Sequence, residues 1–214
     1  MDNPKNDTAD IALSPESIKA DPASGQASGQ KQAKKAPKKI TETYLNNAGL
    51  YYLQRYAASS ARFRTVMGRK IDQSCRHYPE QNKEECLRAL DKLVGKFQDL
   101  GYLNDHSYAR MKVSSLCARG LSRRMILMKL QHAGIPEDQI AAALDDYIAE
   151  NDTTAQETEF AAALKLARKK RVGPYAGDKT YDRNKALAAF ARAGFSFEVV
   201  RKILDLSSED ITEF

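Results

Sequence analysis

Apolar residues recur every three to four positions from about residue 41 almost to the end of the chain. Spacing of this kind places apolar side chains on one face of a helix. No segment alternates apolar and polar residues over the length of a strand. The periodic segments are bounded by residues that begin or end helices, such as a serine before the first turn or a glycine after the last. The pattern predicts an all-α protein with about nine helices and no sheet.

Local signals give the approximate helix boundaries. Asn82 and Glu85, and likewise Thr154 and Glu157, have the spacing of a capping box, in which the first residue accepts from the backbone of the second and the second reaches back. Gly101 follows another periodic segment, where a glycine commonly ends a helix. These positions are predicted helix ends.

The helical pattern repeats along the chain. Ala133-Gly134-Ile135 corresponds to Ala193-Gly194-Phe195, and Ser122 corresponds to Asp182, each before a helix. The nine helices therefore group into triplets. We expect helical repeats at residues 41–103, 104–151 and 152–214, preceded by a disordered Lys-rich tail at residues 1–40. Because a triplet of this size is expected to bury its apolar face incompletely, neighbours are expected to stack into an elongated array.

The composition of residues 1–40 differs from that of the rest. Between Pro22 and Lys39 there are five lysines and no acidic residue, and large apolar residues are few throughout. Such a segment cannot bury enough surface to offset its chain entropy, so we expect disorder. A solubilising leader and a basic arm that contacts phosphates are both consistent with it.

The whole chain is basic, with 34 Lys and Arg against 28 Asp and Glu and a net charge of +6. This balance suits a polyanion or an acidic protein surface. No apolar run approaches the roughly 18 residues of a membrane span, and the first twenty residues lack the basic start and apolar middle of a secretory leader. Three irregularly spaced cysteines do not indicate a disulfide framework. We expect a cytoplasmic protein without a membrane segment.

Three sets of motifs occur in order. The first is Tyr52-Leu53-x-Arg55-Tyr56-Ala57-Ala58-Ser59-Ser60. The second is Gly101-Tyr102-Leu103-Asn104-Asp105 with Tyr108-Ala109, then Arg119-Gly120-x-Ser122-Arg123 and Gly134-Ile135. The third is Arg168-Lys169-Lys170-Arg171-x-Gly173-Pro174 with Ala191-Arg192-x-Gly194-Phe195-Ser196. In this order and spacing they resemble the three repeats of the RecX family, from residue 44 to about 206. His77-Tyr78-Pro79 departs from the glycine turn of the other repeats.

The resemblance implies a non-enzymatic regulator of the bacterial recombinase RecA. RecX proteins are tandem three-helix repeats that lodge in the groove of the RecA–DNA filament and restrain strand exchange, ATP hydrolysis and co-protease activity. The implied partner is the RecA filament on single-stranded DNA, the implied setting is DNA repair and the SOS response, and the implied state is a monomer without a cofactor. Weak direct DNA binding is left open. The resemblance gives a structural role to Gly101, Asp105, Tyr108, Ala109, Gly120, Ser122, Gly134, Ile135, Gly194 and Phe195.

The sequence contains no pattern of a catalytic or metal site. Neither G-x-x-x-x-G-K-[ST] nor G-x-G-x-x-G occurs. Cys75 and His77 lack the spacing of zinc ligands. The paired acids Asp145-Asp146 and Glu84-Glu85 are adjacent, so they point in different directions on a helix. We therefore expect no catalytic residues and no metal.

Three basic clusters are candidates for contact with the filament or its DNA. They are Arg62 and Arg64 with Arg69, Lys70 and Arg76; Arg119, Arg123, Arg124 and Lys129; and Arg168, Lys169, Lys170 and Arg171. Their recurrence favours a continuous basic stripe, and a solvated helix face is the alternative. Aromatic residues do not interleave with these cations in a stacking pattern, so sequence-specific reading of a single strand is not predicted.

Two other functions stay open. Helices joined at Gly120 or Gly134 would form a helix-turn-helix of a stand-alone DNA-binding protein. The acidic Glu137 and Asp138 at the start of the candidate recognition helix count against this, because they would face phosphates. A helical-repeat adaptor that binds another protein without nucleic acid is the second alternative.

Overall fold

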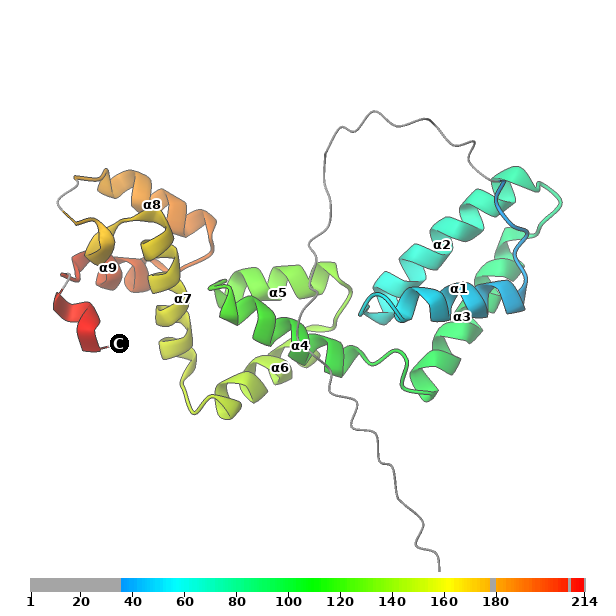
Figure 1. Ribbon diagram of the computed structural model, residues 1–214, viewed down its shortest axis with the longest axis horizontal. Coiled ribbons are helices and arrows are strands. Elements are labelled where there is room, and N and C mark those ends of the chain that lie inside the picture. The colour runs from blue at the N-terminus through cyan, green and yellow to red at the C-terminus, as the bar shows by residue number, and fades with distance from the viewer. Residues whose placement is uncertain (1–35, 178–179, 208, 214) are drawn as a thin grey trace, which may run out of the picture. The chain divides into compact units, whose positions relative to one another are not determined.

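The computed structural model describes residues 36–177, 180–207 and 209–213, without the side chains after Ile211 (Figure 1). Within these residues the chain forms nine α-helices, two short 3-10 helices and no strand. The predicted all-α class and the helix number are therefore confirmed. The predicted disorder of residues 1–35 concerns a segment outside the described residues.

The helices form three consecutive triplets. The first contains α1 (Glu42–Leu53), α2 (Ser60–His77) and α3 (Lys83–Asp99). The second contains α4 (Asp105–Ala118), α5 (Arg123–His132) and α6 (Glu137–Glu150). The third contains α7 (Ala155–Lys170), α8 (Arg183–Arg192) and α9 (Phe197–Asp205), with the short helices η1 (Gly173–Tyr175) and η2 (Glu209–Glu213). These are the tandem three-helix repeats that the sequence predicts.

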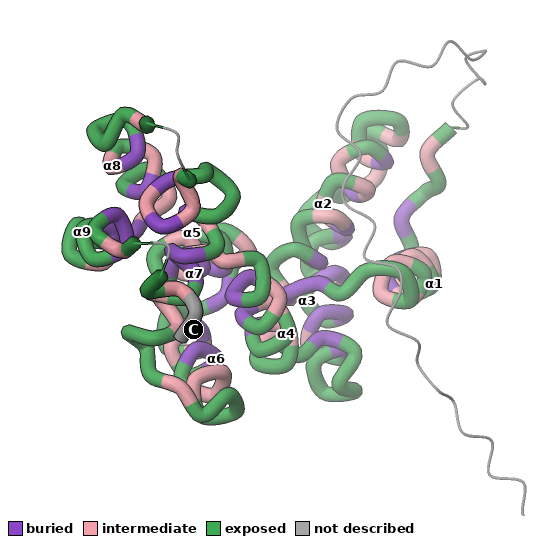
Figure 2. The backbone as a smooth tube through the Cα atoms, turned by 60° about the vertical axis from the view of Figure 1, so that its left-hand side comes forward, coloured by how far each residue is buried: buried purple, intermediate pink, exposed green. Residues whose placement is uncertain are grey.

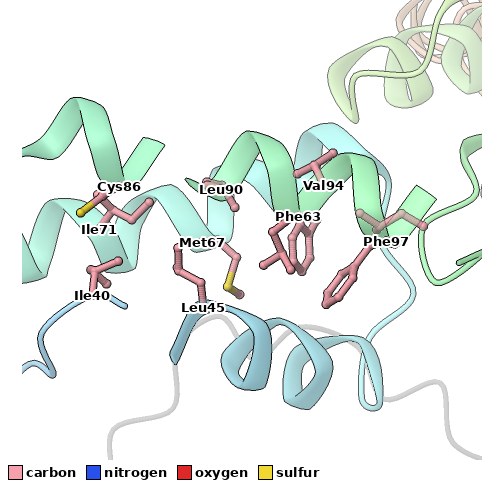
Figure 3. Packing of buried hydrophobic residues seen from close by; sticks show 11 residues of the cluster. Ile40, Leu45, Phe63, Met67, Ile71, Cys86, Leu90, Val94 and Phe97 are labelled. Atoms are coloured by element: carbon pink, nitrogen blue, oxygen red, sulfur yellow. The ribbon is translucent and has the colours of Figure 1, made fainter. Parts of the chain in front are cut away.

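Each triplet encloses a hydrophobic core of its own. Buried residues follow one side of each helix (Figure 2). Phe63 and Phe97 lie in the first core (Figure 3), Ile140 in the second, and Phe190 and Ile203 in the third. Phe63 and Phe190 are completely buried. These exposures are those of a chain with the neighbouring repeats in place, so the expectation that a single triplet buries its apolar face incompletely stays a prediction.

Glycines end the helices at points where the backbone turns left-handed. Gly120, Gly134 and Gly194 follow α4, α5 and α8 with φ of 75°, 77° and 83°. After α5, the N–H of Ile135 donates to the carbonyl of Leu130 at 3.0 Å, as in a Schellman motif. Glycine adopts this φ without the steric cost of a Cβ.

The two predicted capping boxes have different outcomes. Thr154 and Glu157 form the complete reciprocal box at the start of α7. Asn82 caps α3 by accepting from the N–H groups of Glu84 and Glu85. However, the carboxylate of Glu85 accepts from the side-chain amide of Asn82 at 3.4 Å. This side-chain contact replaces the bond from the backbone N–H of Asn82 to Glu85 that would complete a capping box.

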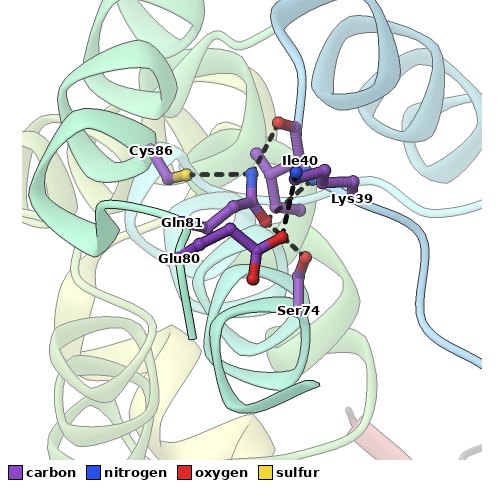
Figure 4. A network of polar contacts seen from close by, with 6 residues as sticks. All are labelled: Lys39, Ile40, Ser74, Glu80, Gln81 and Cys86. Atoms are coloured by element: carbon purple, nitrogen blue, oxygen red, sulfur yellow. Dashed lines mark hydrogen bonds and ion pairs between the residues drawn. The ribbon is translucent and has the colours of Figure 1, made fainter. Parts of the chain in front are cut away.

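The segment before α1 belongs to the first repeat (Figure 4). Ile40 is 7% exposed, and its N–H and carbonyl bond the side-chain amide of Gln81 at 3.2 and 2.8 Å. The hydroxyl of Ser74 donates to the same amide oxygen at 2.7 Å, and Lys39 pairs with Glu80 at 3.0 Å. The predicted tail, which included residue 40, is therefore too long, because Gln81 holds this segment against the α2–α3 turn.

Candidate nucleic-acid interface

A serine at the start of α2 joins the first repeat to the second. The hydroxyl of Ser59 accepts from the N–H of Arg62 at 3.1 Å and donates to the carbonyl of Ala133, at the end of α5, at 2.5 Å. The next N–H, from Ser60, donates to the carboxylate of Asp105, at the start of α4, at 2.7 Å. We call this set of contacts the first joint. It satisfies backbone groups at the ends of helices from two repeats.

The second joint, between the second and third repeats, has the same design. The hydroxyl of Ser122 caps α5 by accepting from Met125 at 3.3 Å and donates to the carbonyl of Ala193, at the end of α8, at 2.6 Å. The next N–H, from Arg123, donates to the carboxylate of Glu159 in α7 at 2.8 Å. At each joint, a serine hydroxyl therefore donates to a carbonyl of the next repeat, and the N–H after that serine donates to a carboxylate of the next repeat.

Close packing at both joints leaves no room for a side chain at the motif glycines. A Cβ on Gly134 would lie 2.2 Å from the Cβ of Ala61. A Cβ on Gly194 would lie 2.8 Å from the hydroxyl oxygen of Ser122. Each glycine therefore adopts the left-handed φ of the turn and leaves room for the preceding repeat to pack closely.

The third repeat differs at the corresponding cap. Asp182 begins α8, and its carboxylate accepts from the N–H of Lys185 at 3.0 Å. An ionised carboxylate accepts hydrogen bonds but has no proton to donate. Within the described residues, Asp182 is exposed and its carboxylate contacts only Lys185. The donor function of the serine is therefore absent from this position.

The remaining motif residues lie in cores or at a helix end. Ala109, Ile135 and Phe195 are buried. Tyr108 is half-buried, and burial raises the pKa of its phenol. Gly101 follows α3 with a φ of 74°. Their positions give all of them a part in folding.

The third basic cluster lies at the C-terminal end of α7. Arg168, Lys169 and Lys170 occupy its last turn, and Arg171 is the C-cap with a left-handed φ of 56°. All four are exposed. Among the described residues, no carboxylate oxygen lies within 4.0 Å of their charged nitrogens. The helix dipole favours cations here, and their unpaired charges face solvent.

The second basic cluster surrounds the α4–α5 turn. Arg119 is the C-cap of α4, Arg123 and Arg124 lie in the first turn of α5, and Lys129 lies in its last turn. All four side chains are exposed. Within the described part of the chain, none of them forms an ion pair.

Lys165 connects the second and third clusters. Its ammonium donates to the carbonyl of Ala118 at the end of α4 at 3.2 Å. A Cβ on Gly120 would lie 2.9 Å from the Cβ of Lys165, so α7 packs closely on this turn. Arg168 and Lys169 follow Lys165 by three and four positions, so all three side chains lie on the same face of α7. Cations from two repeats therefore gather near the end of α4.

The first cluster is partly neutralised. Arg62 and Arg64 are exposed on α2, but Arg64 pairs with Asp91 of α3 at 3.1 Å. Arg76 donates from its side chain to the carbonyl of Asp72 at 3.2 Å. Arg62 is therefore more available than Arg64, and a continuous stripe through all three clusters stays a prediction.

The structure also brings aromatic rings next to a cation, which the sequence-based interpretation missed. The guanidinium carbon of Arg55 lies 3.7 Å from the ring centre of Tyr51. Tyr56 is exposed, and its ring centre lies 5.2 Å from that of Tyr52. Both pairs are separated by four positions, the spacing of neighbours on a helix face. That spacing was the signal that could have identified them.

The described residues contain no group of three His, Cys, Asp or Glu side chains that could hold a metal ion. None of the described helices combines the length and the apolar character of a membrane span. Burial raises the pKa of the thiols of Cys86 and Cys117, so at neutral pH they remain protonated and are weak nucleophiles.

The fold and the joints define a class: an all-helical protein of tandem three-helix repeats with exposed cations. Residues 104–144 match the family described as "RecX, second three-helix domain". A protein named "Regulatory protein RecX" from Myxococcus xanthus is 40% identical over 174 residues, which cover 80% of this chain and 89% of that protein. A protein of the same name from Agrobacterium fabrum is 30% identical over 176 residues, which cover 78% of this chain and 85% of that protein. The chain belongs to the RecX family.

Solved structures show the same fold. A crystal structure of RecX from Lactobacillus salivarius matches with a TM-score of 0.56 at 20% identity, covering 76% of this chain and 93% of that one. A second structure, of regulatory protein RecX, matches with a TM-score of 0.53 at 20% identity, covering 77% of this chain and 72% of that one. The likeness is one of fold, not of detailed sequence.

Proposed function

We propose that this protein binds the RecA filament on single-stranded DNA and restrains its recombinase, ATPase and co-protease activities, without being an enzyme itself. The observation that carries this proposal is the 40% identity to the Myxococcus regulator over 89% of that protein's length. A role in DNA repair and the SOS response, and a place in the cytoplasm, are part of the same proposal.

The unpaired cations support this function physically. Lys and Arg side chains that contact phosphates release condensed counterions, so they contribute affinity that falls as salt rises. Opposite charge on the partner also accelerates association. The cations around Arg119, Arg124 and Arg168 are exposed and have no carboxylate partner among the described residues. They are therefore free to contact DNA phosphates or acidic side chains of a filament.

The joints support binding by more than one repeat. Because Ser122 and Glu159 fix the start of α5 against the third repeat, cations from two repeats are presented together. Lys165 adds a further link to the end of α4. A surface assembled in this way before binding loses less conformational freedom on association.

The test is ATP hydrolysis by RecA on single-stranded DNA with this protein titrated in. We expect the rate to fall at substoichiometric to near-equimolar protein, and strand exchange to fall with it. Unchanged rates at a several-fold excess, with both proteins folded, would refute the proposal. Binding to naked DNA and to the filament, compared over a range of salt, separates this function from a stand-alone DNA-binding protein and from an adaptor.

A further inference from the structure

An exposed patch of aromatic and cationic side chains lies at the end of α1. We call it the tyrosine patch, and it consists of Tyr51, Tyr52, Arg55 and Tyr56. Tyr51 is 60% exposed and Tyr56 is 58% exposed. The guanidinium of Arg55 lies 3.7 Å from the ring centre of Tyr51, a cation–π contact. Single exposed aromatics are ordinary, but here two large rings and a cation are exposed within six residues of chain, 51–56.

The hydrophobic core holds this patch in place. Phe63 and Phe97 are buried with ring centres 5.6 Å apart. Tyr52 lies 6.2 Å from Phe63, and Tyr56 lies 5.2 Å from Tyr52. An unbroken series of ring contacts therefore runs from the core to the surface. Tyr56, held through Tyr52, loses little conformational freedom when a flat ligand stacks on it. Tyr51 lies outside this series and is held by Arg55.

The chain segment that carries the patch is basic, although the carboxylate of Asp105 reaches it at the N–H of Ser60. Residues 43–71 contain five cations and no Asp or Glu. Of these, Arg64 is neutralised by Asp91, whereas Arg62, in the first turn of α2, forms no ion pair within the described residues. An apolar protein surface on the rings would leave these cations uncompensated. A polyanion that also presents flat unpaired rings satisfies both the cations and the tyrosines.

We propose that the tyrosine patch binds single-stranded DNA by stacking unpaired bases on Tyr51 and Tyr56, with Arg55 and Arg62 next to the phosphates. Aromatic rings combined with a positive surface bind single strands with little sequence preference, since every base has a flat face. In a duplex the bases are stacked on one another, so the patch selects single strands. The choice of DNA over RNA rests on the proposed function, and the binding itself is measured without RecA.

The first experiment uses the full chain and a fluorescein-labelled dT oligonucleotide, with affinity measured by anisotropy. The double variant Tyr51→Ala/Tyr56→Ala is expected to bind on the order of ten- to a hundred-fold more weakly. Tyr51→Phe/Tyr56→Phe keeps the rings and is expected to stay within about threefold of the parent. Tyr102→Ala is the matched control, because Tyr102 is 55% exposed and also packs on Phe97. Equal affinity of the alanine variant and the parent would overturn the proposal.

The second experiment changes the ligand instead of the protein. An abasic oligonucleotide of the same length carries the phosphates without the bases, so stacking predicts that the parent binds it at least about tenfold more weakly. Equal affinity for both oligonucleotides would overturn the proposal, and this comparison decides the matter if the alanine variant loses its helical circular dichroism. If the parent inhibits RecA but does not bind naked single strands, the tyrosine patch proposal fails while the proposed function stands. If the alanine variant loses RecA inhibition at unchanged DNA affinity, the patch contacts protein and the proposal is wrong.

Discussion

The hydroxyl oxygen of Ser122 lies 2.6 Å from the carbonyl oxygen of Ala193, 71 residues further along the chain. The same hydroxyl caps α5 by accepting from the N–H of Met125. Ser59 repeats both contacts at the first joint, with Ala133 as its acceptor. A serine hydroxyl carries one proton and two lone pairs, so it can donate to one repeat while it accepts within another. Each joint therefore depends on a residue that is both donor and acceptor.

Replacing Ser122 by alanine should destabilise the protein by about 2–3 kcal/mol, because the variant loses a helix cap and leaves a backbone carbonyl without its donor. Urea unfolding followed by circular dichroism measures the change. Ser196→Ala is the control, because Ser196 caps α9 by accepting from Val199 but does not join two repeats, so that only about 1 kcal/mol should be lost. Equal losses in the two variants would show that the bond to Ala193 adds nothing.

Replacing Gly134 by alanine should cost more stability than replacing Gly101. Both have a left-handed φ, of 77° and 74°, so both variants incur a backbone cost of about 1–2 kcal/mol. The new Cβ at position 134 would also lie 2.2 Å from the Cβ of Ala61, whereas position 101 has no atom within 4 Å. We expect an additional loss of about 1–3 kcal/mol for Gly134→Ala, by analogy with overpacking. Equal urea midpoints for the two variants would contradict tight packing at the first joint.

The carboxyl of Glu159 should make the stability of the second joint depend on pH. Burial raises its pKa above the ordinary value of 4.5, and the N–H of Arg123 only partly opposes this. Between the pKa of Glu159 in the unfolded chain and its raised pKa in the folded protein, the folded state binds more protons. The contribution of Glu159 to stability is therefore fully present below the unfolded pKa. It is lost as pH rises through the folded pKa. Glu159→Gln removes this titration and keeps an oxygen acceptor for Arg123.

We therefore expect the stability of Glu159→Gln relative to the parent to increase as pH rises from below to above 4.5. Urea midpoints of both proteins across this range measure the difference. Glu157→Gln gives the opposite sign, since its hydrogen bonds from Thr154 lower the pKa of the Glu157 carboxyl. A pH-independent difference between the parent and Glu159→Gln would show that the raised pKa does not matter for folding.

The cations at the end of α7 should contribute to filament binding and little to stability. The triple variant Arg168→Ala/Lys169→Ala/Lys170→Ala should unfold at nearly the parent urea concentration, because exposed charges contribute little. Its inhibition of RecA should weaken, and the slope of log affinity against log salt should fall by roughly 0.7–0.9 for each phosphate that the variant no longer binds. Adding Arg171→Gly removes a fourth charge at a φ of 56°, which glycine adopts readily.

The charge-matched control for this prediction is Arg88→Ala/Lys92→Ala/Lys96→Ala, which removes three cations from α3. It changes the net charge equally but leaves the α7 cluster intact. If the two triple variants inhibit RecA equally at low and at moderate salt, the α7 cluster is a solvated helix face. The second cluster or the Lys-rich segment would then be the next candidates.

Local residue patterns predicted where several helices begin and end. Thr154 and Glu157 form the predicted capping box, and Gly101 follows the end of α3 as predicted. These features depend on residues a few positions apart, which the helix brings together whatever the rest of the chain does. The periodicity of apolar residues likewise depends on one helix at a time, so the all-α class and the triplets were predictable.

How the triplets are joined, and which side chains share a surface, depends on contacts between residues far apart in the sequence. The capping role of Ser122 is local and was predicted, but its bond to Ala193 required the third repeat to be in place. Composition alone places Ile40 in the predicted tail, whereas its backbone bonds Gln81, 41 positions later in the sequence. The tyrosine patch is supported from beneath by Phe63 and Phe97, on two other helices. Contacts over such separations depend on how several helices pack together. The residue pattern within one helix does not tell where the other helices lie, so these contacts could not be predicted from it.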